Sequence, residues 1–147
     1  SRKRGDGKMT REEVKQRLNG YQHVRMERRQ LLERIIRLET RLTAPGAQNL
    51  DGMPHGSGRG DALANGVAML AELRHLYREK EIELAQAQID IEHLIEHLEP
   101  IERVIARYRY IDGHGWRKVC GLMQPRGYSE RTVYRLHGEA LRKLKEV

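Results

Sequence analysis

The sequence predicts an all-α protein in which a long helical hairpin or coiled coil is followed by a C-terminal domain of short helices. Apolar residues recur at helical steps over long stretches, and capping residues and Gly/Pro breaks separate those stretches. The apolar content is also low, at 38% of 147 residues, with 5% aromatic residues and no Phe. Helices that each bury one narrow stripe need few large apolar side chains.

The composition also excludes several classes of protein. A mean hydropathy of −0.78 argues against an enzyme with a deep apolar pocket, so we expect no catalytic residues, no cofactor and no metal. No stretch approaches the roughly 18 apolar residues that a membrane span needs, so we expect no membrane partner. Cys120 is the only cysteine, which excludes an internal disulfide framework and is typical of a reducing, cytoplasmic location.

The first predicted helix covers about residues 10–42. Thr10 followed by Glu13 is the pattern of a capping box, which marks a helix start. Apolar residues then follow at three- and four-residue steps, interrupted once by Arg28: Val14, Leu18, Tyr21, Val24, Leu31, Ile35, Leu38 and Leu42.

Residues 43–60 are rich in Gly, Pro, Asn and Ser and show no periodicity, so they predict a flexible loop. Within the loop, residues 56–60 read Gly-Ser-Gly-Arg-Gly. A phosphate-binding loop would need a strand before it and a Lys-Ser/Thr pair after it, and both are missing. A linker is the better interpretation.

The second predicted helix covers about residues 61–99 and completes an N-terminal part of residues 1–99. Its apolar residues repeat every seven positions, which is typical of a coiled coil: Leu63, Leu70, Tyr77, Leu84, Ile91 and Leu98. Pro100 then ends it. The two long helices can pair within one chain or between the chains of a homodimer, and the sequence leaves both open.

Charge alternates along the chain. Residues 1–42 hold 13 basic and 6 acidic residues, residues 61–99 hold 3 basic and 9 acidic residues, and residues 100–147 hold 11 basic and 5 acidic residues. We expect the basic first helix to pair mainly with the acidic second helix. The basic C-terminal part then has no internal partner and is available to an anion.

Residues 100–147 predict a helix-turn-helix domain. A short helix over 100–111, a turn at 112–115 and a helix over 116–123 are followed by a break at 124–127. Ser129 is a good N-cap for a last helix that runs to about Lys145. We expect the following residues to face inward on these helices: Ile101, Val104, Ile105, Tyr108, Trp116, Val119, Cys120, Met123, Val133, Leu136, Ala140 and Leu144.

The first turns of the last helix carry side chains that suit DNA bases. Arg binds guanine edges in a bidentate manner, Glu accepts from cytosine and Thr contacts the thymine methyl group. The residues that we expect to read bases are Ser129, Glu130, Arg131, Thr132, Tyr134 and Arg135. Those that we expect to contact phosphates are Arg117, Lys118, Arg126, Arg142 and Lys143.

The same residues resemble a known family. Arg-Tyr-Ile-Asp-Gly at 109–113, Trp-Arg-Lys-Val at 116–119, the stretch 127–135 and Ala-Leu-Arg-Lys-Leu at 140–144 resemble region 4 of sigma-70-type transcription factors. The resemblance is greatest to small phage and prophage regulators. It covers the last third of the chain and implies promoter-type binding to double-stranded DNA and contact with RNA polymerase. Ser129 lies ten residues after Val119, where the family usually has about seven, so the turn is longer here.

Two other functions remain open. A phage DNA-packaging adaptor similar to a small terminase subunit also combines DNA-binding and oligomerising helices. A coiled-coil adaptor would instead bind a protein through the long helices. We expect no zinc site from the pattern His93-Leu94-Ile95-Glu96-His97, since its polar residues should face solvent.

Overall fold

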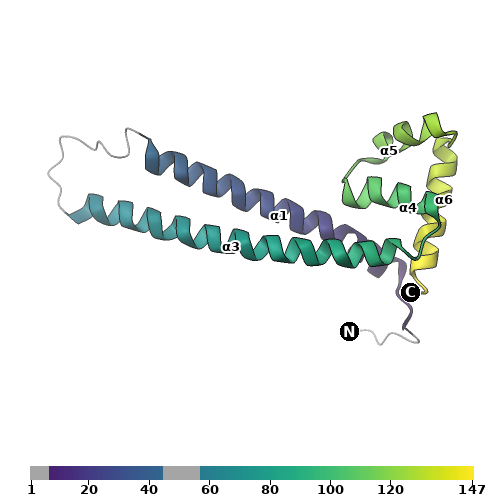
Figure 1. Ribbon diagram of the computed structural model, residues 1–147, viewed down its shortest axis with the longest axis horizontal. Coiled ribbons are helices and arrows are strands. Elements are labelled where there is room, and N and C mark those ends of the chain that lie inside the picture. The colour runs from purple at the N-terminus through teal and green to yellow at the C-terminus, as the bar shows by residue number, and fades with distance from the viewer. Residues whose placement is uncertain (1–6, 45–56) are drawn as a thin grey trace. The chain divides into compact units, whose positions relative to one another are not determined.

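The computed structural model describes residues 7–44 and 57–147, although not the side chains of 57–59. These residues are helical, without a strand among them, in the order α1 (Arg11–Thr43), α3 (Ser57–Ile95), α4 (Pro100–Ala106), a π-helical segment (Arg107–Ile111), α5 (Trp116–Met123), a 3-10 turn (Gln124–Arg126) and α6 (Glu130–Leu144) (Figure 1). The all-α class and the long helical hairpin are confirmed. In the part of the chain that is described, no helix has the length and apolar character needed to cross a membrane.

The predicted loop over 43–60 falls mostly outside the described residues, which omit 45–56. Its last residues, 57–60, were expected in the loop but belong to α3. The chain forms two compact units, unit 1 (Ser1–Val24 with Leu84–Val147) and unit 2 (Arg25–Glu83). The boundary predicted at residues 99/100 does not separate them, because the start of α1 and the end of α3 pack with the C-terminal helices.

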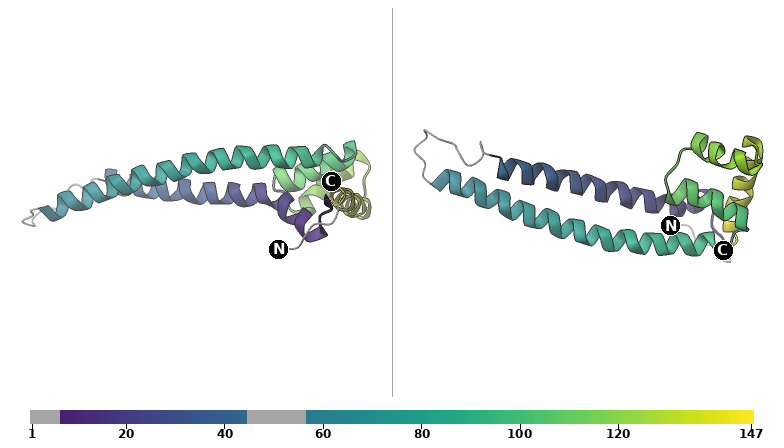
Figure 2. Two further views of the ribbon diagram at one scale, coloured as in Figure 1. Left: turned by 90° about the horizontal axis from the view of Figure 1, so that it is seen from below. Right: turned by 45° about the horizontal axis from the view of Figure 1, so that its top comes forward.

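Unit 2 is an antiparallel pair formed by the later part of α1 and the earlier part of α3 (Figure 2). Ile35, Leu38 and Leu70 form its buried core, with Leu42, Leu73 and Tyr77 packed at the edges. A Cβ atom on Gly66 would lie 2.6 Å from Cδ2 of Leu42, so glycine lets the two helices approach closely at this point.

The seven-residue repeat of α3 is buried at Leu70, Leu84, Ile91 and Leu98, as predicted, but not at Leu63, which is 47% exposed. Leu63 lies about one turn closer to the start of α3 than Gly66, which already meets Leu42 near the end of α1. The described part of α1 therefore ends before it can cover Leu63. The helix was also expected to reach residue 99, but it ends at Ile95. The turn that follows brings Leu98 back into the core.

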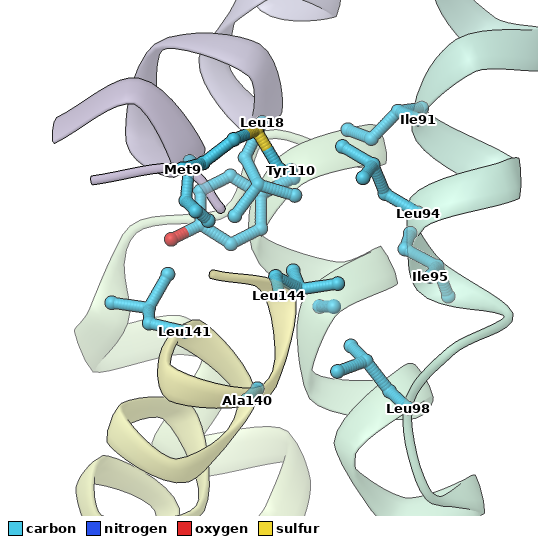
Figure 3. Packing of buried hydrophobic residues seen from close by; sticks show 12 residues of the cluster. Met9, Leu18, Ile91, Leu94, Ile95, Leu98, Tyr110, Ala140, Leu141 and Leu144 are labelled. Atoms are coloured by element: carbon cyan, nitrogen blue, oxygen red, sulfur yellow. The ribbon is translucent and has the colours of Figure 1, made fainter. Parts of the chain in front are cut away.

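Unit 1 has two apolar cores. The first joins the start of α1, the end of α3 and the end of α6, and is shown in Figure 3. The buried residues of this first core are Met9, Val14, Leu18, Ile91, Leu94, Ile95, Leu98, Ala106, Tyr110, Ala140, Leu141 and Leu144. The capping box of α1 is confirmed, because the backbone N–H of Glu13 donates to Oγ1 of Thr10 and the backbone N–H of Thr10 donates to Oε1 of Glu13, both at 3.1 Å.

The second core joins α4, α5 and α6. Ile105, Val119, Met123, Val133 and Leu136 are buried in it. The other residues expected to face inward here are partly buried at its edge: Ile101, Val104, Tyr108, Trp116 and Cys120. Burial raises the pKa of the Cys120 thiol. The helix predicted over 100–111 is not regular, because α4 ends at Ala106 and the next five residues form the π-helical segment.

Candidate nucleic-acid interface

The start of α6 is fixed by local hydrogen bonds. Gly127 has φ 93°, a left-handed conformation that favours glycine and reverses the chain after α5. Ser129 is the N-cap, as predicted, since the backbone N–H of Thr132 donates to its Oγ at 3.2 Å. The hydroxyls of Ser129 and Thr132 also lie 2.9 Å apart. The first turn of α6 therefore has a defined conformation.

The two sides of α6 differ sharply. One side is buried against the rest of unit 1 through Val133, Leu136, Ala140, Leu141 and Leu144. The other side is exposed and carries Glu130, Arg131, Tyr134, Arg135 and Arg142. These exposed residues follow the 3.6-residue period, so they lie on neighbouring rows of one helix surface. The buried side thus anchors α6 and leaves its first turns accessible.

The predicted base-reading residues fall into different environments. Arg131 is exposed and has no hydrogen bond or ion pair with any described residue. Nη1 of Arg135 lies 3.0 Å from Oε1 of Glu139, in an exposed pair one turn apart. Such pairs contribute little and exchange easily with an anion. Glu130 is exposed, whereas Thr132 is half-buried and hydrogen-bonded to the N-cap residue Ser129.

Trp116 connects the start of α5 to the middle of α6. Its ring centroid lies 5.4 Å from that of Tyr134 and 4.4 Å from that of His137. The guanidinium carbon of Arg109 lies 4.9 Å from the Trp116 centroid, a cation–π contact. Tyr134 remains 45% exposed. Sequence reasoning placed Trp116 in the core and missed this cluster, because the contacts with Arg109 and His137 come from elements distant in sequence.

His137 is also hydrogen-bonded to Tyr110, with 2.5 Å between Nε2 and Oη. Burial lowers the pKa of His137 to about 4, and the positive charges of Arg109, Arg11 and Lys15 contribute. His137 is therefore neutral at pH 7. Burial likewise raises the pKa of Tyr110 to about 12, so its hydroxyl stays protonated. This pair fixes α6 against the π-helical segment.

The predicted phosphate-binding residues divide into two groups. The first group is exposed and forms no ion pair or hydrogen bond within the described residues: Arg117, Lys118, Arg126 and Arg142. Lys143 differs, because its Nζ lies 2.8 Å from Oε1 and 3.0 Å from Oε2 of Glu102. Glu102 is only 2% exposed. Lys143 therefore forms an ion pair within unit 1.

The zinc-like pattern has no metal-binding arrangement. His93, Glu96 and His97 are exposed, and α3 ends at Ile95, so the three residues do not share one regular helix. Within residues 7–44 and 57–147, no group of three His, Cys, Asp or Glu side chains could hold a metal ion.

Comparisons of the chain with protein-family models, with curated proteins and with solved structures find no match. The functional interpretation therefore depends on the residues and geometry of unit 1.

Proposed function

We propose that the chain is a sequence-specific DNA-binding protein in which α5, the turn and α6 act as a helix-turn-helix. In this arrangement the exposed first turns of α6 enter the major groove of double-stranded DNA. The main support is the state of Arg131. It is exposed at the start of a capped and anchored helix, and no described residue pairs with it. Two parallel N–H donors on a fixed helix suit the O6 and N7 atoms of guanine.

The neighbouring residues have supporting roles in this proposal. Arg135 exchanges its exposed pair with Glu139 for a base or a phosphate. Glu130 accepts from cytosine, and Ser129 and Thr132 hold the helix start in position. Tyr134, packed on Trp116, presents its exposed edge beside the two arginines. Its large rigid side chain loses little entropy on contact.

Phosphate contacts are assigned to Arg117, Lys118, Arg126 and Arg142. Arg117 and Lys118 lie in the first turn of α5, and Arg126 lies in the turn between the helices. Cations at these places neutralise phosphates on either side of a groove and give affinity without sequence information. Lys143 is not assigned to DNA, since its ion pair with the buried Glu102 carboxylate occupies it.

The likeness to region 4 of sigma-70-type factors extends this proposal to transcription. By that likeness the protein is a regulator of phage or prophage type, acts in the cytoplasm and contacts RNA polymerase. The basic C-terminal part and the single cysteine agree with this extension.

The proposal is tested by selecting bound sites from random duplexes with the full chain. We expect one enriched sequence, and we expect Arg131→Ala to weaken binding to it by about 1–3 kcal/mol. Arg78→Ala removes an arginine of unit 2 that is also exposed and should leave this affinity unchanged. No enriched sequence, or equal effects of the two substitutions, would contradict the proposal.

A second candidate function concerns unit 2. Several of its large apolar side chains are exposed: Met26, Leu32, Ile36, Leu63, Val67, Met69, Leu76 and Ile82. Leu32 and Ile36 lie one turn apart on α1, and Met69 and Leu76 lie two turns apart on α3, so each pair shares one side of its helix. Exposed apolar side chains that lie together are typical of a protein-binding face, and we propose a second copy of this chain as the partner. Light scattering should give the mass of a dimer, and Ile36→Glu should lower it to that of a monomer. A monomeric wild type would exclude the homodimer, and a large closed ring would favour the DNA-packaging adaptor.

A further inference from the structure

The first turns of α1 carry two cations, Arg11 and Lys15, that the acidic helix does not neutralise. The charge pattern predicted that the basic residues of α1 pair with α3. In unit 1 only Arg17 does so, with Nη2 2.8 Å from Oδ1 of Asp90. Arg11 and Lys15 have no ion pair or hydrogen bond to any residue in the described ranges. Their charges are therefore available to an external anion.

These two cations are held in a fixed position relative to α6. The backbone N–H of Met9 donates to the carbonyl of Lys145 at 2.9 Å. Leu18 shares a buried core with Leu141 and Leu144 (Figure 3). Val14 belongs to the same core. The start of α1 is thus fastened to the end of α6 by a hydrogen bond and by apolar packing.

The side of α1 that carries Arg11 and Lys15 faces the π-helical segment. Lys15 and Gln22 follow Arg11 by 4 and 11 residues, and both spacings return to nearly the same side of an α-helix. Gln22 therefore lies on the side that carries Arg11 and Lys15. Nε2 of Gln22 donates to the carbonyls of Tyr110, at 3.0 Å, and Ile111, at 2.6 Å. Arg109 in that segment lies against Trp116, which packs on α6.

The pKa of His137 supports this arrangement. Burial is the main cause of its decrease, but the charges of Arg109, Arg11 and Lys15 also reach the imidazole. His137 lies one turn after Tyr134 on α6, and both rings pack on Trp116. The start of α1 therefore adds positive potential next to the proposed DNA-binding face.

Two local interactions disfavour cations at these positions. Arg11 is the first residue of α1, where the helix dipole is positive and destabilises a positive side chain. Lys15 follows four residues later, and like charges at that spacing repel each other. A polyanion that lies alongside offsets both unfavourable interactions by attracting the two cations.

We infer that Arg11 and Lys15 contact DNA phosphates and form a second binding element beyond α5 and α6. This inference rests on the proposed function and adds the start of the long helix to its binding surface. The two side chains contact only the backbone of the DNA, so they supply affinity without a preference for any base.

The test is the salt dependence of DNA binding by the full chain carrying R11Q and K15Q. The slope of log K against log salt concentration is negative, and its magnitude should decrease by nearly two, since each phosphate contact contributes about 0.9. Affinity at 0.1 M salt should fall by at least roughly tenfold. The selected sequence should not change, and Tm should stay equal or rise, because the substitutions remove the unfavourable helix-dipole and like-charge interactions.

The matched control carries R37Q and R41Q. Both arginines are exposed and, like Arg11 and Lys15, lie four residues apart on α1, but they belong to unit 2. The control therefore removes the same net charge. It should leave the salt slope unchanged. An unchanged slope for the R11Q/K15Q variant, or an equal decrease in the control, would overturn the inference. If the wild type selects no site, the proposed function itself fails, which is a different outcome.

Discussion

Lys143 on α6 lies 2.8 Å from the carboxylate of Glu102 on α4. Glu102 is almost completely buried, and its Oε1 also accepts the backbone N–H of Glu99 at 2.9 Å. The carboxylate therefore closes the start of α4 and binds α6 to it at the same time. A basic residue that the sequence suggested for DNA thus stabilises unit 1.

The first prediction follows from this pair. Lys143→Met leaves a buried carboxylate without its cation, so we expect a Tm several degrees lower. The salt slope of DNA binding should remain that of the wild type. Arg142→Met should show the reverse, an almost unchanged Tm and a slope smaller by about 0.9.

Thermal unfolding and a salt titration of both variants check this prediction. The adjacent positions make the two variants a matched pair, since each loses one positive charge from α6. A smaller salt slope for the Lys143 variant at an unchanged Tm would show that the Glu102 pair does not occupy this side chain.

The second prediction concerns pH. The pKa of His137 is about 4 in the folded chain, against an ordinary value of 6.5. Between these values the unfolded chain binds a proton that the folded chain does not, so the free energy of unfolding rises with pH. The contribution of neutral His137 is complete above pH 6.5 and is lost as the pH falls toward 4.

Urea unfolding at pH 7, 5.5 and 4.5 measures this dependence. His137→Gln carries no titrating group, so its stability should decrease less on acidification than that of the wild type. The comparison removes the contribution of the carboxylates, which both proteins share. Identical pH dependence in the two proteins would refute the role given to His137.

The third prediction uses two glycines. Gly127→Ala places a Cβ at φ 93° and should lower the free energy of unfolding by about 1–2 kcal/mol. Gly121→Ala lies inside α5, where no atom is within 4 Å of the added Cβ, and should raise it by about 0.4–1 kcal/mol. Denaturant unfolding measures both changes in the free energy of unfolding. If the two changes had the same sign, the left-handed conformation given to Gly127 would be disproved.

The fourth prediction tests the first core of unit 1. Leu141 is 1% exposed, so Leu141→Ala should cost about 2–5 kcal/mol of stability. Ile89→Ala truncates a side chain that is 49% exposed and should stay within about 0.5 kcal/mol of the wild type. Guanidinium unfolding gives both values, and a small loss for Leu141→Ala would show that α6 does not pack as described.

Local signals in the sequence predicted much of the fold. The capping box at Thr10 and Glu13, the N-cap at Ser129 and the buried residues of α6 depend on neighbours within a few positions. The seven-residue repeat predicted most of the buried side of α3. These features could be predicted because helix starts and apolar stripes are local.

Contacts between distant elements could not be predicted in the same way. The end of α3 at Ile95 depends on the turn that carries Leu98 into the core, and the exposure of Leu63 depends on where α1 ends. The pairing of Lys143 with Glu102 joins residues 41 positions apart. The basic first helix was expected to pair mainly with the acidic second helix, but in unit 1 helix register brings only Arg17 of its basic residues to a carboxylate on α3. In each case tertiary packing decided the outcome.

The central claim is that Arg131 reads a base, and a double-mutant cycle between protein and DNA tests it most directly. Wild type and Arg131→Ala are each titrated with the selected duplex and with duplexes changed at one base pair. We predict a coupling of about 1–3 kcal/mol at one guanine and almost none elsewhere. If the loss caused by Arg131→Ala is the same on every duplex, Arg131 does not read a base, and the account of α6 is contradicted.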